Sequence, residues 1–129
     1  MSFKLEKEQT NTTPYILIDE ERRYMKFKGK CYLEDIVDFF YDINEWLEKY
    51  LAAESIELTF DCEMKYFNSS TTKMIYNMLR SMDKAAGKGA NIVVNWIVND
   101  DNDMIIECGE DFEEEMEHLT FNLVIRRWL

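Results

Sequence analysis

Residues 56–65 read IELTFDCEMK, and residues 66–86 follow as YFNSSTTKMIYNMLRSMDKAA. In the first part, apolar side chains at every second position alternate with polar or charged ones; they are Ile56, Leu58, Phe60, Cys62 and Met64. This alternation is typical of a strand with one face on the core and the other in water. A sheet between two helical layers would make such a strand apolar throughout, so we expect helices mainly on one face.

The second part predicts a helix from about Ser70 to Ala86. Its apolar side chains recur at spacings of three and four residues, which places them on one stripe; they are Met74, Ile75, Met78, Leu79 and Met82. Core packing accounts for a methionine stripe at this spacing. Gly87 stands where a glycine can cap the end of the helix.

The remaining segments extend the pattern on both sides. Residues 33–51 carry apolar side chains at spacings of three and four with acids between them, which predicts another helix. Residues 15–18 and 22–28 predict a hairpin, residues 91–97 a central strand and residues 120–125 a last strand. A polar loop at residues 99–103 opens a third helix, which carries an acidic run up to Glu117.

The order hairpin, helix, strand, helix, strand, helix, strand indicates the fold class. Strand–helix–strand units make neighbouring strands parallel through right-handed crossovers. We therefore expect one α/β domain over residues 14–129, with a mixed, mostly parallel sheet and an N-terminal hairpin. The 129 residues fit a single domain of ordinary size. Residues 1–13 are polar and precede the only proline, Pro14, so we expect a flexible arm there.

Charge narrows the class of partner. The chain has 15 Lys and Arg against 26 Asp and Glu, which gives a formal net charge of −11 at pH 7. Nucleic acids and anionic membranes bind through Lys and Arg, so we expect neither as a partner. A hydrophobic fraction of 47% excludes a disordered tail. We expect the partners to be proteins.

The cysteine pattern and the first residues of the chain indicate the cellular compartment of the protein. Cys31, Cys62 and Cys108 form no CxxC pair and His118 is the only histidine, so no zinc ligand set stands out. The first residues carry charges where a signal peptide is apolar, and no apolar run approaches about 20 residues. We expect a reduced, cytoplasmic protein.

Patterns for enzyme chemistry are weak. His118 has no GxSxG serine as a partner, no Gly-rich phosphate loop is present, and the loop at residues 99–103 lacks the glycine of a calcium loop. We expect no cofactor, no metal and no enzyme activity. Two alternatives are a small metal-dependent enzyme that uses the acidic C-terminal region, and a constitutive protein-interaction subunit.

One segment departs from the usual pattern of a helix start. Residues 68–73, NSSTTK, place four hydroxyl side chains near a first helical turn that carries no acid. Asn68 or Ser69 would cap the helix, and one cap would suffice. The helix dipole would tolerate a phosphate there, which adds about −1.5 to −2 charge. The residues alone fit a cap and a phosphorylation switch equally.

The same residues carry a family resemblance. Tyr66-Phe67-Asn68-Ser69-Ser70 ahead of a methionine-rich helix, with Val94-Asn95-Trp96 on the next strand, resembles the SiaC family of bacterial regulatory phosphoproteins. Thr13-Pro14, the hairpin and the aromatic-rich first helix are also similar to that family. The resemblance extends over nearly the whole chain from about Thr12.

The resemblance implies a STAS-like fold, related to anti-sigma factor antagonists, and a partner-switching role. It implies that a serine/threonine protein kinase phosphorylates a hydroxyl directly after the asparagine and that a metal-dependent phosphatase removes the phosphate. By position the acceptor is Ser69, with Ser70 and Thr71 as neighbouring alternatives. The expected partner-binding residues are Tyr66, Phe67, Asn68 and Ser70. In the best-known system of this kind, the unphosphorylated protein activates a diguanylate cyclase, which links the switch to cyclic-di-GMP and biofilm formation.

Overall fold

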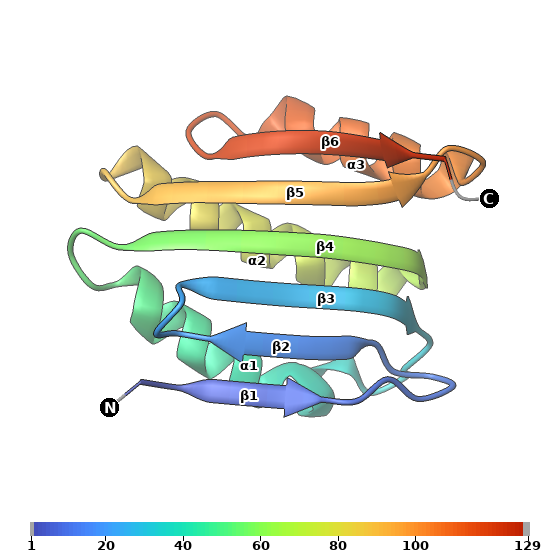
Figure 1. Ribbon diagram of the computed structural model, residues 1–129, viewed down its shortest axis with the longest axis horizontal. Helices are drawn as coiled ribbons and strands as arrows, with labels where there is room; N and C mark the ends of the chain where they lie inside the picture. The colour runs from blue at the N-terminus through green and yellow to red at the C-terminus, as the bar shows by residue number, and fades with distance from the viewer. Residues whose placement is uncertain (1, 128–129) are drawn as a thin grey trace.

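The computed structural model describes residues 2–127. One six-stranded sheet crosses the molecule with its strands in chain order, and three helices connect the later strands (Figure 1). The strands are β1 (Lys4–Lys7), β2 (Tyr15–Asp19), β3 (Tyr24–Cys31), β4 (Glu57–Phe67), β5 (Asn91–Asn99) and β6 (Thr120–Arg126). The helices are α1 (Ile36–Leu51), α2 (Ser69–Gly87) and α3 (Asp103–Glu115).

Strand direction divides the sheet into two parts. β1, β2 and β3 pair antiparallel, whereas β3, β4, β5 and β6 pair parallel. One helix makes each parallel connection, and all three helices lie behind the sheet in the view of Figure 1. Crossovers of one hand return every helix to the same face when the strands follow in order. The predicted fold class, an α/β domain with a mostly parallel sheet covered mainly on one face, is confirmed.

The hydrophobic core fills the space between the helices and the sheet. Leu58, Phe60 and Cys62 of β4 are at most 1% exposed, while the residues between them reach the other face. Ile75 and Leu79 of α2 belong to the same buried cluster. Burying one such side chain fully stabilises the fold by about 1.5–3 kcal/mol. Among residues 2–127, no helix has the length and apolar character needed to cross a bilayer.

A chain of polar contacts crosses four strands on the helix-free face. Tyr24 Oη donates to Asp61 Oδ2 (2.7 Å). Asn95 Nδ2 donates to Asp61 Oδ1 (2.8 Å), and Asn95 Oδ1 accepts from Asn122 Nδ2 (3.0 Å). Burial, together with the bond to Asp61, raises the pKa of Tyr24. The paired groups keep this face polar without the cost of unsatisfied donors and acceptors.

The N-terminal segment differs from the flexible arm expected over residues 1–13. Lys4–Lys7 form β1, which pairs antiparallel with β2 at the edge of the sheet. Leu5 packs against the core, and Lys7 Nζ donates to the backbone oxygen of Phe39 (3.2 Å) while lying over its ring. The strand escapes a search for apolar alternation because an edge strand is short and tolerates charged side chains.

The first helix begins later than its apolar pattern indicates. α1 starts at Ile36 rather than at Leu33. The Asp35 carboxylate caps the helix by accepting from the backbone N–H of Asp38 (3.2 Å). A cap of this kind fixes where helical backbone can begin, so Leu33 remains in the connection from β3.

The sequence pattern indicates that Gly87 caps α2, but in the structure it does not. The helix runs through Gly87, and the left-handed backbone lies at Gly89, with φ of +109°. A Cβ at position 87 would come within 2.8 Å of the His118 ring. The glycine therefore permits close packing of the segment before β6, while Gly89 makes the turn.

Candidate functional site

Asn68 lies where β4 ends and α2 begins, at the carboxyl edge of the parallel strands (Figure 1). Its backbone is extended, and its Oδ1 accepts from the N–H of Thr71 (3.1 Å), so Asn68 rather than Ser69 caps the helix. Its Nδ2 donates to the backbone oxygen of Leu33 (3.0 Å) in the connection before α1. One side chain thus joins the start of α2 to the connection between β3 and α1.

The hydroxyl side chains after Asn68 lie in three different environments. Thr71 is fully buried, and its Oγ1 lies 2.9 Å from Asn68 Oδ1 and 3.3 Å from Cys31 Sγ. Ser70 is exposed, but its Oγ donates to Asn68 Oδ1 (3.0 Å). Ser69 is exposed, and its hydroxyl has no hydrogen-bond partner within residues 2–127. Ser69 alone of these three combines an accessible oxygen with freedom from local bonds.

The first turn of α2 is electrostatically open to an anion. It carries no acidic side chain, so the positive end of the helix dipole is not neutralised by the chain itself. Lys73 is exposed and follows Ser69 by four residues, a spacing at which side chains on a helix are neighbours. Thr72 Oγ1 donates to the backbone oxygen of Asn68 (3.0 Å) and is already engaged.

The two aromatic residues before Asn68 have different surroundings. Phe67 is 5% exposed and meets Trp96 edge-on, with ring centroids 6.1 Å apart. Its side chain lies in the core and not at the surface. We therefore no longer expect Phe67 to contact a partner. Tyr66 is half-buried and stacks on the exposed ring of Tyr32, with centroids 4.8 Å apart.

A hollow of about 430 Å³ lies between α1 and α2 and reaches Ser70. Its lining comes from both helices: Ile36, Val37, Asn44, Glu48, Ser70, Lys73, Met74 and Asn77. On α1, Val37 is 70% exposed and Tyr41 is 57% exposed. Exposed apolar side chains beside a hollow are typical of protein-binding surfaces. The hollow is therefore a candidate interaction surface next to the cap of α2.

The other chemistry-bearing side chains do not converge in the described part of the chain. Within residues 2–127, no three His, Cys, Asp or Glu side chains are placed to hold a metal ion. His118 lies at the surface beside Glu117, with Nε2 and Oε2 3.9 Å apart. Burial raises the pKa of Cys62, and burial with Asp111 nearby raises the pKa of Cys108 to about 11. A raised pKa lowers the fraction of thiolate, which is the reactive form, at neutral pH.

One carboxylate of α2 has a clear structural role. Asp83 is 9% exposed, and it accepts backbone N–H bonds from Glu117 (3.1 Å), His118 (2.7 Å) and Leu119 (3.0 Å). Burial acts to raise its pKa, but the three N–H donors and the nearby His118 ring hold the pKa below its usual range. Asp83 fixes the segment that leads from α3 into β6.

Part of this geometry has a signal in the sequence and part has none. Thr71 lies four residues before Ile75, on the apolar stripe of α2, and that spacing indicates its burial. The bond from Asn68 to Leu33 and the contact of Thr71 with Cys31 join residues 35 and 40 positions apart. No local pattern announces contacts at such separations.

Comparison with known proteins establishes the family. Residues 7–126 match the model described as "SiaC family regulatory phosphoprotein". The chain therefore belongs to the SiaC family. A protein of Pseudomonas aeruginosa (strain UCBPP-PA14), named as uncharacterised, is 26% identical over 106 residues, which cover 82% of this chain and 84% of that protein.

Solved structures from Pseudomonas aeruginosa share the fold. SiaC superposes with a TM-score of 0.87 at 23% identity, over 96% of this chain and 99% of that one. The crystal structure of the diguanylate cyclase SiaD in complex with its activator SiaC matches with a TM-score of 0.88 at 24% identity, over 95% of this chain and 99% of that one. These superpositions establish a common fold over almost the whole length.

Proposed function

We propose that this chain is a non-enzymatic phospho-switch of a partner-switching system. In the unmodified state, the surface around Ser69 binds and controls a partner such as a diguanylate cyclase. A serine/threonine protein kinase transfers a phosphoryl group from ATP to the Ser69 hydroxyl. A metal-dependent phosphatase hydrolyses the phosphoester and restores the binding state.

The contrast among three neighbouring hydroxyls carries this proposal. Thr71 is buried and bonded, Ser70 is bonded to Asn68, and Ser69 is exposed and unengaged. A kinase has to bring the acceptor oxygen to the phosphoryl group without unfolding its substrate. Ser69 meets that requirement with no loss of the bonds that hold the start of α2.

The position of Ser69 explains how a phosphate would change binding without changing the fold. At the first residue of α2, a phosphate meets the positive end of the helix dipole and is tolerated by the chain. A partner that covers the hollow between α1 and α2 would have to desolvate the new charge. The family and the complex of SiaD with SiaC support a diguanylate cyclase as the class of partner.

The test compares Ser69→Ala and Ser69→Asp for binding to the diguanylate cyclases of the same organism by calorimetry. We expect Ser69→Ala to bind within about twofold of the unmodified protein, because the hydroxyl makes no internal bond. We expect Ser69→Asp to bind at least roughly tenfold more weakly, since a charge left unpaired in an interface costs at least about 1.4 kcal/mol.

Asn91→Asp is the matched control, because it adds the same charge on an exposed residue at the amino end of β5. The control should leave binding unchanged, and thermal unfolding should show that all variants are folded. Equal binding by Ser69→Ala and Ser69→Asp would contradict the proposal.

A further inference from the structure

We propose that the helix-free face carries a second docking surface, which takes an extended, acidic segment of a protein partner. Its centre is a set of three lysines at the carboxyl ends of β3 and β4, Lys28, Lys30 and Lys65, which we name the lysine ridge.

The sign of the charge reverses at the lysine ridge. The chain carries a net charge of −11, yet three lysines lie on two adjacent strands. Lys28 Nζ lies 3.7 Å from Glu63, and the same carboxylate lies 3.8 Å from Arg126, so one acid serves two cations. Within residues 2–127, the ammonium groups of Lys30 and Lys65 have no carboxylate at ion-pair distance. The local excess of positive charge is available to a partner.

A β-bulge sets the position of Lys65. Gly29 pairs with Met64 and Lys30 pairs with Tyr66, which leaves Lys65 as an extra residue in β4. Gly29 has φ of +114°, so the irregularity is built into both strands. Bulges redirect a side chain and are frequent next to functional sites.

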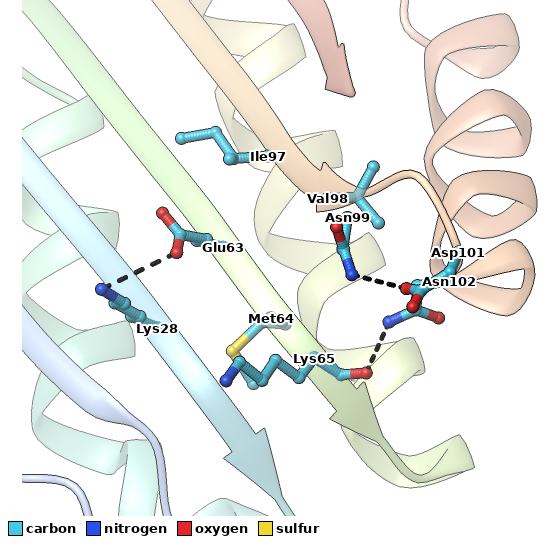
Figure 2. Close-up of a pocket in the computed structure, with 9 residues that line it drawn as sticks. All are labelled: Lys28, Glu63, Met64, Lys65, Ile97, Val98, Asn99, Asp101 and Asn102. Atoms are coloured by element: carbon cyan, nitrogen blue, oxygen red, sulfur yellow. Dashed lines mark hydrogen bonds and ion pairs between the residues drawn. The ribbon is translucent and has the colours of Figure 1, made fainter. Parts of the chain in front are cut away.

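The backbone at the bulge is bonded by Asn102, the residue that caps α3. Asn102 Nδ2 donates to the backbone oxygen of Lys65 (2.8 Å), as Figure 2 shows. The carbonyl is thus satisfied without using the lysine side chain. The side chain of Lys65 remains exposed, while its backbone is held by the bond from Asn102.

Two hollows flank the lysine ridge and share Lys28 and Lys65. The larger, of about 440 Å³, lies between the ends of β4 and β5 and includes Ile97 and Asn99 in its lining (Figure 2). Its one further acid, Asp101, accepts a bond from Asn99 (2.6 Å). The smaller, of about 250 Å³, lies between the end of β3 and residues 9–11.

This shape favours an extended segment over a compact anion. A chain that crosses the lysine ridge can place carboxylates on the ammonium groups and a neighbouring side chain in each hollow. The lining of the larger hollow includes Ile97, which is 7% exposed. Polyanionic nucleic acid would meet the overall charge of −11 beyond the lysine ridge. An acidic protein segment satisfies both the local charge and the shape.

The test uses a synthetic peptide of roughly eight glutamates, which spans about 26 Å when extended. Binding to the isotope-labelled chain is followed by amide NMR shifts. We expect saturable shifts confined to residues 28–30, 63–65 and 97–102. The triple variant Lys28→Gln, Lys30→Gln and Lys65→Gln should bind roughly tenfold more weakly, because three surface ion pairs are lost.

The control removes the same charge from the carboxyl ends of two helices. Lys49, Lys84 and Lys88 are exposed and lie at the ends of α1 and α2, so Lys49→Gln, Lys84→Gln and Lys88→Gln should keep affinity within about twofold. Equal losses in both triple variants, shifts centred elsewhere, or no saturable binding would overturn the proposal. Inorganic phosphate shifting the same residues at equal affinity would replace the extended segment with a small anion and overturn it as well.

Discussion

Helices α2 and α3 begin in the same way but differ in the first turn after the cap. Each starts after a parallel strand, and each has an asparagine cap whose Oδ1 accepts from the N–H three residues on. The cap Nδ2 also donates to a backbone oxygen elsewhere, from Asn68 to Leu33 and from Asn102 to Lys65. α3 then places Asp103 in its first turn, whereas the first turn of α2 has hydroxyls and no acid.

The difference between the two helix starts bears on the proposed phosphorylation of Ser69. Asn102 and Asp103 start α3 with one cap and one acid facing the dipole, an arrangement that stabilises a helix. Asn68 supplies the cap for α2, but no acid comes after it. The exposed Ser69 therefore stands where α3 has a negative charge, and a phosphate would supply that charge reversibly.

Asp83 is an acid with a structural role, and we expect its replacement to have the largest effect on the free energy of unfolding. Asp83→Asn keeps the shape but removes the charge that three backbone N–H groups meet. We expect a loss of about 2–3 kcal/mol in the free energy of unfolding, measured with urea at pH 7. A loss below about 0.5 kcal/mol would place this carboxylate with ordinary surface acids.

The pH dependence of stability, compared between the unmodified chain and Asp83→Asn, tests the role of Asp83 a second time. The pKa of Asp83 is lowered in the folded state, so its contribution is complete above the ordinary aspartate pKa of about 3.9 and is lost as the pH falls through the folded pKa. Urea unfolding between pH 7 and pH 2 should therefore show a smaller acid dependence for Asp83→Asn than for the unmodified chain. Parallel curves would contradict the assignment.

The two caps should differ in strength. Asn68 Oδ1 receives bonds from the Thr71 N–H, the Thr71 hydroxyl and the Ser70 hydroxyl, whereas Asn102 Oδ1 receives a single bond from Ile105. We expect Asn68→Ala to lower the free energy of unfolding by about 2 kcal/mol and Asn102→Ala by about 1 kcal/mol. Equal losses would show that the additional donors around Asn68 do not contribute to stability.

Exchanging the first-turn residues should have the smallest effect and opposite signs. Ser69→Asp places a charge at the free dipole of α2, and Asp103→Ser removes one from α3. We expect the first to raise and the second to lower the free energy of unfolding by about 0.3–1 kcal/mol at low salt. High salt should reduce both changes. Destabilisation by Ser69→Asp would contradict this interpretation, because a negative charge such as that of a phosphate would then be unfavourable at the start of α2.

Much of the fold could be predicted because its signals are local. The alternation from Ile56 to Met64 and the stripe from Met74 to Met82 define the strand, the helix and the one-sided sheet. β1 could not be predicted because edge pairing demands little of the sequence. The predicted start of α1 at Leu33 was wrong because the Asp35 cap decides where the helix begins. The predicted capping role of Gly87 was wrong because the helix runs through Gly87, which packs closely against His118.

The candidate site could be located from the sequence but not resolved. The run of hydroxyls after Asn68 has a clear position, yet its members differ only in tertiary contacts, such as that of Thr71 with Cys31. The lysine ridge has no sequence signal, because Lys28 and Lys65 meet only through the pairing of β3 with β4. Contacts between distant segments decide which side chains are free to act.

Phosphorylation of Ser69 is tested most directly by phosphopeptide mapping of the chain isolated from its own cells, with intact mass measured alongside. A phosphoryl group adds about 80 Da. We expect this addition on Ser69, its loss in Ser69→Ala and its retention in Ser70→Ala. A phosphate on Thr71, or full phosphorylation of Ser69→Ala, would contradict it.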